Sequence, residues 1–228
     1  MRIMKTIARV IWIIIFTGFT LVSRADPHNW NLKGGKTIYG DYVSSGPTNL
    51  VLAQGGTNVF VAISNLATNE FPFFLKCQIA QRQAHLDAQT NQMIKAGRIE
   101  FSSDLLEKSP EKVVNKSGWM DGEYDGLKDD MVESKRDELG IFLHDKNDDM
   151  VANVVAFKTN LNGVPMPVIA DLRKLKRGDK FRMFGTAASA GLKDNQIRLY
   201  IDRIEIIETK SEADSISQAD QNSSAGLK

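Results

Sequence analysis

The sequence contains almost no cysteine, which excludes the protein classes that depend on disulfides. Cys77 is the only cysteine in 228 residues, so the chain cannot form an internal disulfide and its core must be stable without one. A cysteine nucleophile needs a basic partner, and no motif places one beside Cys77. A free reactive thiol stays open as an alternative, but the sequence favours a buried cysteine on a helix.

Catalytic and metal-binding motifs are also missing. The three histidines, His28, His85 and His144, lie far apart and in no metal-ligand spacing. No Gly-x-Ser-x-Gly motif surrounds any serine, and no glycine-rich loop precedes a helix in a phosphate-binding pattern. We therefore expect a protein that is not an enzyme, with no catalytic residue, no cofactor and no metal site.

An excess of basic charge is lacking once the N-terminus is set apart. Four of the 29 basic residues and none of the 28 acidic residues lie in residues 1–25, so the remainder of the chain has a net charge of −3. A strongly basic surface is therefore not a property of the whole chain. Export, which residues 1–25 predict, argues against nucleic acid as the partner.

Residues 1–25 have the three parts of a signal peptide: a basic start, an apolar run over 10–22 and the small-residue site Ser23-Arg24-Ala25. The apolar run of 13 residues is shorter than the roughly 20 that span a bilayer, which favours cleavage after Ala25 over a retained membrane anchor. We expect the mature chain to be exported, periplasmic or extracellular, without stable membrane insertion.

Residues 26–70 form the first predicted domain. Short alternating apolar runs over 30–66, separated by glycine- and proline-containing turns, predict three or four consecutive antiparallel strands. In the last run, Val59 and Val61 fall on one face and Phe60 on the other. A meander of this size fits a small SH3-like barrel.

The same segment resembles the SLA homology domain 1 family, small SH3-like modules known from endocytic adaptors and from exported bacterial proteins. The matching residues are Trp30, Gly34-Gly35-Lys36, Tyr42-Val43, Asn49 to Leu52, Gly55-Gly56, Val61 to Ile63 and Leu66. The closing Leu-Ser-x-x-Asp motif of the family differs here, because Ala67 replaces the serine and Glu70 replaces the aspartate. The resemblance covers about forty residues and implies an SH3-like fold.

Residues 71–138 are predicted to form a helical and acidic linker region. Apolar residues at helical spacing predict a helix over 69–97, and glutamines fill much of its remaining surface. A coiled-coil dimer is the alternative to a helix that packs within the chain. Further on, the glycine-rich acidic stretch 121–126 matches a calcium loop at several positions. Val132 stands where the bidentate glutamate belongs, so a solvated acidic turn followed by a polar helix is favoured.

Residues 139–208 are predicted to form an OB-like five-stranded barrel. The expected strands are 141–144, 150–161, 165–170, 180–189 and 196–208, with a hairpin turn at Asn162-Gly163 and a short crossing segment over 171–177. The apolar alternation changes phase after Ile201, which predicts a bulge near Asp202-Arg203. The passage 172–185 is similar to one found in bacterial OB-fold families. The tail 209–228 has few apolar residues and is predicted to be disordered.

The predicted fold class is therefore mainly β with a helical linker (α+β). Peptide recognition uses exposed aromatics, and the candidates in the SH3-like barrel are Trp30, Tyr42 and Phe60, with a core position for Trp30 as an equal alternative. The OB-like barrel offers a basic run with aromatic neighbours that could bind an anion. Its candidate residues are Lys176, Arg177, Lys180, Arg182, Arg198 and Tyr200, with Phe184 beside them.

These features together predict an exported, non-enzymatic binding protein. It would recognise a peptide or protein partner through the SH3-like module, with the OB-like barrel as a second binding module. An anionic glycan, the envelope surface or an acidic protein would suit the basic run. The alternative is a structural or assembly component of the cell envelope that oligomerises through the glutamine-rich helix.

Overall fold

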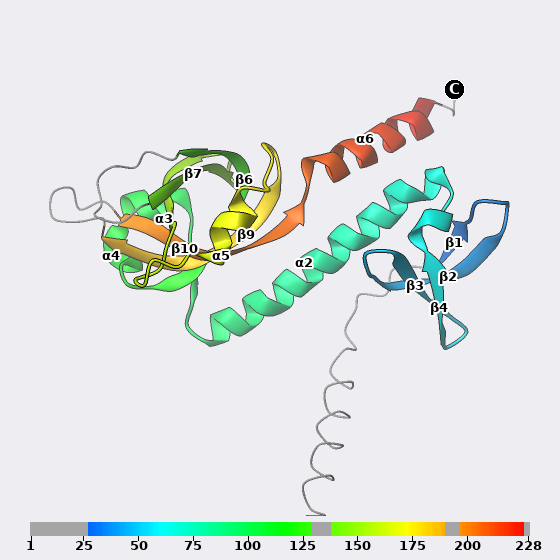
Figure 1. Cartoon of the computed structure of the whole chain (residues 1–228), viewed down its shortest axis with the longest axis horizontal. Coiled ribbons are helices and arrows are strands. Elements are labelled where there is room, and N and C mark those ends of the chain that lie inside the picture. The colour runs from blue at the N-terminus through cyan, green and yellow to red at the C-terminus, as the bar shows by residue number, and fades with distance from the viewer. Residues whose placement is uncertain (1–26, 129–137, 190–196, 226–228) are drawn as a thin grey trace, which may run out of the picture. The chain divides into compact units, whose positions relative to one another are not determined.

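The computed structural model describes residues 27–128, 138–189 and 197–225, so the predicted signal peptide, the polar helix after Lys128 and the position of Val132 lie outside the described residues. The chain divides into two compact units, unit 1 up to Ala84 and unit 2 from His85 (Figure 1). The boundary falls within helix α2 (Phe71–Lys95). The fold is mainly β with several helices, as predicted. None of the helices in the described part is long and apolar enough to cross a bilayer.

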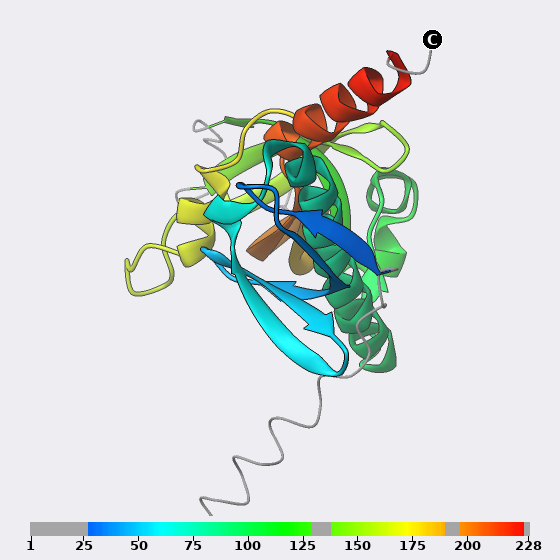
Figure 2. The ribbon, with the colours of Figure 1, turned by 90° about the vertical axis from the view of Figure 1, so that its right-hand side faces the viewer.

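Unit 1 contains the predicted meander of four strands. These are β1 (His28–Asn31), β2 (Thr37–Ser45), β3 (Asn49–Gln54) and β4 (Thr57–Ala62). They pair antiparallel in chain order (Figure 2, blue to cyan). Two short 3₁₀ turns, η1 (Ile63–Asn65) and η2 (Thr68–Glu70), then lead into α2.

The core of unit 1 forms between one face of this sheet and the start of α2. Alternation along the strands directs Leu50, Leu52 and Val61 to this face, where Trp30 and Phe74 complete the cluster. The predicted helix over 69–97 is confirmed as α2. Its first half buries Phe74 and Cys77 in unit 1, and its second half buries Leu86 and Met93 in unit 2.

Unit 2 is built on a ring of strand pairings. The strands are β5 (Ile99–Glu100), β6 (Ser117–Lys128), β7 (Glu138–Asp145), β8 (Met150–Phe157), β9 (Lys180–Ser189) and β10 (Ile197–Glu208). The order β6-β7-β8-β10-β9 returns to β6 through an additional β6–β9 pairing. The β8–β10 pair is parallel, and the other four pairings of the ring are antiparallel. The predicted bulge is confirmed, because the register of β10 shifts between Ile201 and Arg203.

Short helices pack against this ring, and one of them occupies a segment where a strand is predicted. They are α3 (Ser103–Lys108), α4 (Pro110–Val113) and α5 (Pro167–Leu172), and each buries apolar residues in the main core. The expected strand over 165–170 is wrong, because Pro167 opens α5 at a position where proline favours a helix. The turn at Asn162-Gly163 is present but leads into α5, with Gly163 at φ +75°.

The expected acidic turn and disordered tail are also wrong. Residues 121–126 lie within strand β6, which pairs with β7 on one side and β9 on the other. The ring therefore begins at Ser117, inside the segment predicted as linker. Helix α6 (Lys210–Ala225) occupies most of the tail. Thr209 and Glu212 cap its start reciprocally, since each side chain accepts a hydrogen bond from the backbone N–H of the other.

Candidate ligand face on the strand ring

The three aromatic candidates of unit 1 do not form one surface. Trp30 is fully buried and donates its Nε1–H to the Gly40 carbonyl at 3.1 Å, while its ring packs against Tyr42 and Phe73. Tyr42 is also in the core, and its hydroxyl donates to Gln81 Oε1 at 2.8 Å. Only Phe60 is exposed, at 72%. The core alternative is therefore confirmed for Trp30, and the prediction of an exposed aromatic is wrong for Tyr42.

Arg182 is not a solvent-facing cation. It is 4% exposed, and its Nε and Nη2 donate to both carboxylate oxygens of Asp121 on the neighbouring strand. Its Nη1 donates to the Leu86 carbonyl of α2 at 2.9 Å. Phe184 does point out of the ring, as expected, but it is buried against Leu86 and Met93. The second half of α2 thus covers the outer face of β6 and β9, and this face cannot bind an anion through Arg182.

The other members of the basic run lie on the surface. Arg177 pairs with Asp125 at 2.7 Å, and Lys180 pairs with Glu208 at 3.0 Å. Lys176 is exposed in the segment before β9. Lys180 lies beside Glu208, and Glu208 is eight residues from Tyr200 along β10, or roughly 26 Å at the rise of a β-strand. The run does not converge with Arg198 and Tyr200 on one site, and carboxylates offset much of its charge.

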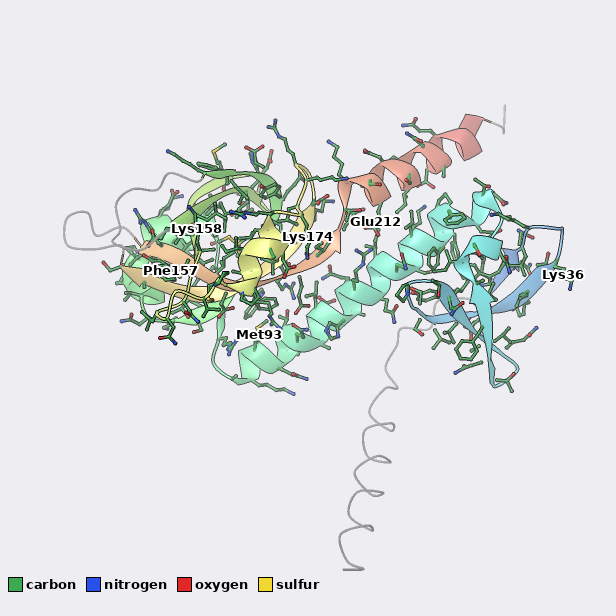
Figure 3. The ribbon with its side chains drawn as sticks, in the orientation of Figure 1. Lys36, Met93, Phe157, Lys158, Lys174 and Glu212 are labelled. Carbon is green, nitrogen blue, oxygen red and sulfur yellow. The ribbon has the colours of Figure 1, made fainter. Side chains whose placement is uncertain are left out.

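Arg198 and Tyr200 lie together on a second outer face of the ring, formed by β7, β8 and β10. They alternate with the core residues Ile197, Leu199 and Ile201, so both point outward. Tyr200 stacks on Phe157 of β8, with ring centroids 4.9 Å apart and an interplanar angle of 16°. Both rings remain partly exposed. Figure 3 labels Phe157 and Lys158 where β8 ends.

An ion pair crosses the same face. Arg198 Nη1 donates to Glu138 Oε2 at 3.0 Å. Glu138 alternates with the core residue Leu139, so it too points outward, from β7. Because β8 lies between β7 and β10, the pair spans β8, and Val155 beneath it is fully buried. Both side chains of the pair are nearly inaccessible, at 7% and 1% exposure. We call the set Glu138, Phe157, Arg198 and Tyr200 the ring face.

Sequence reasoning found half of the ring face. Arg198 and Tyr200 were predicted from the alternation of β10. Phe157 and Glu138 were missed because they lie at the end and start of other strands, and only the pairing of Glu138 with Phe157 brings them together. The described residues include no cluster of three or more histidine, cysteine or carboxylate side chains that could hold a metal.

No protein-family profile matches the chain, and no curated protein matches it. Solved structures share similarity with part of it. An OBody bound to hen egg-white lysozyme has a TM-score of 0.32 and 15% identity, covering 43% of this chain and 87% of that one. Asparaginyl-tRNA synthetase from Pyrococcus horikoshii complexed with asparaginyl-adenylate has a TM-score of 0.32 and 14% identity, over 43% of this chain and 20% of its own.

Aspartyl-tRNA synthetase from Entamoeba histolytica has a TM-score of 0.35 and 10% identity, over 51% of this chain and 22% of its own. The chain thus spans about a fifth of each of these synthetases.

Proposed function

We propose that this chain is an exported, non-enzymatic binding protein whose unit 2 is an OB-like barrel that binds an uncharged oligosaccharide on the ring face. The strand order supports the OB-like assignment: the ring runs first-second-third-fifth-fourth, with a helix between the third and fourth strands. In OB folds, the face over the second and third strands binds oligonucleotides and oligosaccharides. Those strands are β7 and β8 here. For unit 1 we propose an SH3-like module of the SLA homology domain 1 kind.

The main observation behind this proposal is the stacked pair of Phe157 and Tyr200. The two rings are partly exposed and each covers one face of the other, so a ring of the ligand would extend the stack from a remaining face. Among the described residues of the ring face, the one cation, Arg198, is paired with the carboxylate of Glu138 at 3.0 Å. A nucleic acid or an anionic glycan needs cations along its path. The ring face is therefore better suited to an uncharged sugar chain.

The test is a binding titration of the full chain with three probes: a neutral oligosaccharide panel, an anionic glycan and a single-stranded oligonucleotide. We expect binding of a neutral sugar whose affinity changes little between low and high salt. Phe157→Ala and Tyr200→Ala should each weaken it by about fivefold to a hundredfold, since one stacked ring contributes about 1–3 kcal/mol. Tyr39→Ala is the matched control, because Tyr39 is an exposed aromatic in unit 1.

Other outcomes would overturn parts of the proposal. Binding of the oligonucleotide with a steep loss of affinity at high salt would identify a polyanion as the ligand. Recovery of a cleaved sugar by mass spectrometry would contradict the non-enzymatic assignment. Equal affinities of Phe157→Ala, Tyr200→Ala and Tyr39→Ala would place the site elsewhere.

The contacts of the glutamine-rich helix argue against the assembly alternative. Gln81 accepts from the Tyr42 hydroxyl, Gln78 donates to Ser45 Oγ at 2.9 Å, and Gln89 donates to Glu205 at 3.3 Å. These side chains are used within the chain, so they are not free to form the contacts of a helical oligomer.

A further inference from the structure

Strand β4 lies at one edge of the unit 1 sheet, and its outer side has no partner strand within the described ranges. The opposite edge, formed by β1, is covered at its C-terminal end. There the Ala67 N–H donates to the Asn31 carbonyl at 2.9 Å, and the Lys33 N–H donates to the Asn65 carbonyl at 2.8 Å. The segment that follows β4 therefore pairs with the end of β1 and not with the β4 edge.

The β3–β4 turn determines which backbone groups face this open edge. Gly55 and Gly56 have φ values of +56° and +85°, as in the two-residue type I′ turn, so Gln54 and Thr57 form a hydrogen-bonded pair. Such pairs alternate with non-bonded ones along an antiparallel ladder. Asn58, Phe60 and Ala62 then direct their N–H and C=O groups away from β3.

A second observation fits this alternation. The Ile63 N–H donates to the Thr48 carbonyl at 2.8 Å, which is the bonded pair expected after the non-bonded pair of Asn49 with Ala62.

The β4 edge lacks the devices that usually prevent strand pairing. Natural edge strands are shortened, bulged, charged or interrupted by proline. β4 has six residues, Thr57–Ala62, none of them charged and none proline, and its pairing with β3 shows no register shift. Phe60 is 72% exposed in the middle of it. The edge is therefore ready to accept another strand.

We propose that the β4 edge binds an extended, uncharged segment of a partner protein as an added strand. The outward backbone groups of Asn58, Phe60 and Ala62 would bond to that segment, and an apolar side chain of the segment would pack on Phe60. The absence of charge along β4 fits a neutral segment, because a charged one would lose solvation there without gaining an ion pair. This site lies in unit 1, goes beyond the proposed function, and does not depend on the ring face.

The experiment uses the full chain and a labelled synthetic peptide with the β3 sequence Asn49–Gln54, which pairs with β4 in the fold. We expect this peptide to bind. Asn58→Pro removes an outward N–H donor without removing a bond to β3, so it should reduce affinity at least tenfold. The matched control Asn58→Ala changes the same side chain but keeps the donor, so it should bind like the original chain. Phe60→Ala should weaken binding severalfold.

Two further measurements keep the test decisive. The same peptide with every backbone nitrogen methylated keeps its side chains but loses its donors, so it should not bind, even if Asn58→Pro fails to fold. Equal binding of the methylated peptide, or of Asn58→Pro and Asn58→Ala, would overturn the proposal. The proposal would also be overturned if sedimentation shows that the original chain is a dimer and that only the Asn58→Pro variant dissociates. The segment bound at the β4 edge would then belong to a second copy of this chain. Phe157→Ala should leave peptide binding unchanged, which separates this test from that of the ring face.

Discussion

Replacing Arg182 with methionine should destabilise unit 2 more than any surface substitution of the basic run. Arg182 lies opposite Asp121 in the β6–β9 ladder and binds both carboxylate oxygens. It also donates to the Leu86 carbonyl and to Thr90 Oγ1 on α2. The hydrogen bond with Asp121 raises the pKa of the guanidinium above its ordinary value, so the group is charged at every working pH. Arg182→Met removes all of these contacts at once.

The expected loss of unfolding free energy follows from the Asp121 carboxylate, which remains without its partner. Removing one partner of a buried ion pair costs about 3–5 kcal/mol, because the remaining charge is poorly solvated. The Asp121 side chain keeps 32% exposure, so water can solvate part of its charge and the low end, about 3 kcal/mol, applies. Urea unfolding of the full chain, followed by circular dichroism, measures this loss.

Lys180→Met on the same strand is the matched control. Its ion pair with Glu208 is on the surface, where such pairs contribute about 0–1 kcal/mol. The double variant Asp121→Leu with Arg182→Met should recover much of the lost stability, since apolar replacement of a buried pair is often neutral or stabilising. The reasoning is refuted if Arg182→Met and Lys180→Met lose equal stability, or if the double variant is the least stable of the set.

Three other predictions follow from single side chains. Burial opposes ionisation of Asp145, but hydrogen bonds from Ser103 and from nearby backbone N–H groups lower the pKa of its carboxyl overall. Its stabilising contribution is therefore present above the ordinary value of 3.8 and is lost as the pH falls through the lower folded pKa, so Asp145→Asn should flatten the acid limb of an unfolding titration. Burial raises the pKa of the Cys77 thiol to about 11, so at pH 8 a thiol reagent should modify the native chain far more slowly than the unfolded chain. Thr209→Ala should cost about 0.5–2 kcal/mol of α6 stability, seen as faster amide hydrogen exchange in that helix; unchanged exchange would contradict the cap.

Elements whose apolar residues recur at a regular spacing could be predicted from the sequence. The apolar residues of α2 recur at helical spacing because one stripe of the helix is buried, and the helix was found within two residues at each end. The bulge in β10 was found for a similar reason. Ile201 and Ile204 are both in the core, and an alternating strand can place both there only if one residue is skipped between them.

Strand β6 could not be predicted because the residues that make it fit as a strand do so through contacts with segments distant in sequence. Glycine and aspartate are depleted in strands, so 121–126 reads as a turn. Gly118 is required because a Cβ there would lie 1.9 Å from the Ile99 carbonyl oxygen of the adjacent β5. Asp121 is acceptable because Arg182 stands opposite it on β9. Each feature has a physical reason, but none of these reasons is visible without the pairing.

The helix α6 carried a signal that could have been used. Thr209 and Glu212 have the spacing of a capping box, and this motif marks a helix start even where apolar residues are few.

The candidate site shows a more general limit. Alternation assigned Phe184 and Tyr200 correctly to the outside of the ring, yet Phe184 is 2% exposed and Tyr200 is partly open. Alternation separates core from outside, but it does not say which outer face another element covers. A clue was present in α2: Leu86 and Met93 are seven residues apart on a stripe that needs an apolar counterpart, which Trp119 and Phe184 supply. The same helix covers Phe184, which packs against the stripe, and Arg182, which donates to the Leu86 carbonyl, so neither side chain is available to a ligand.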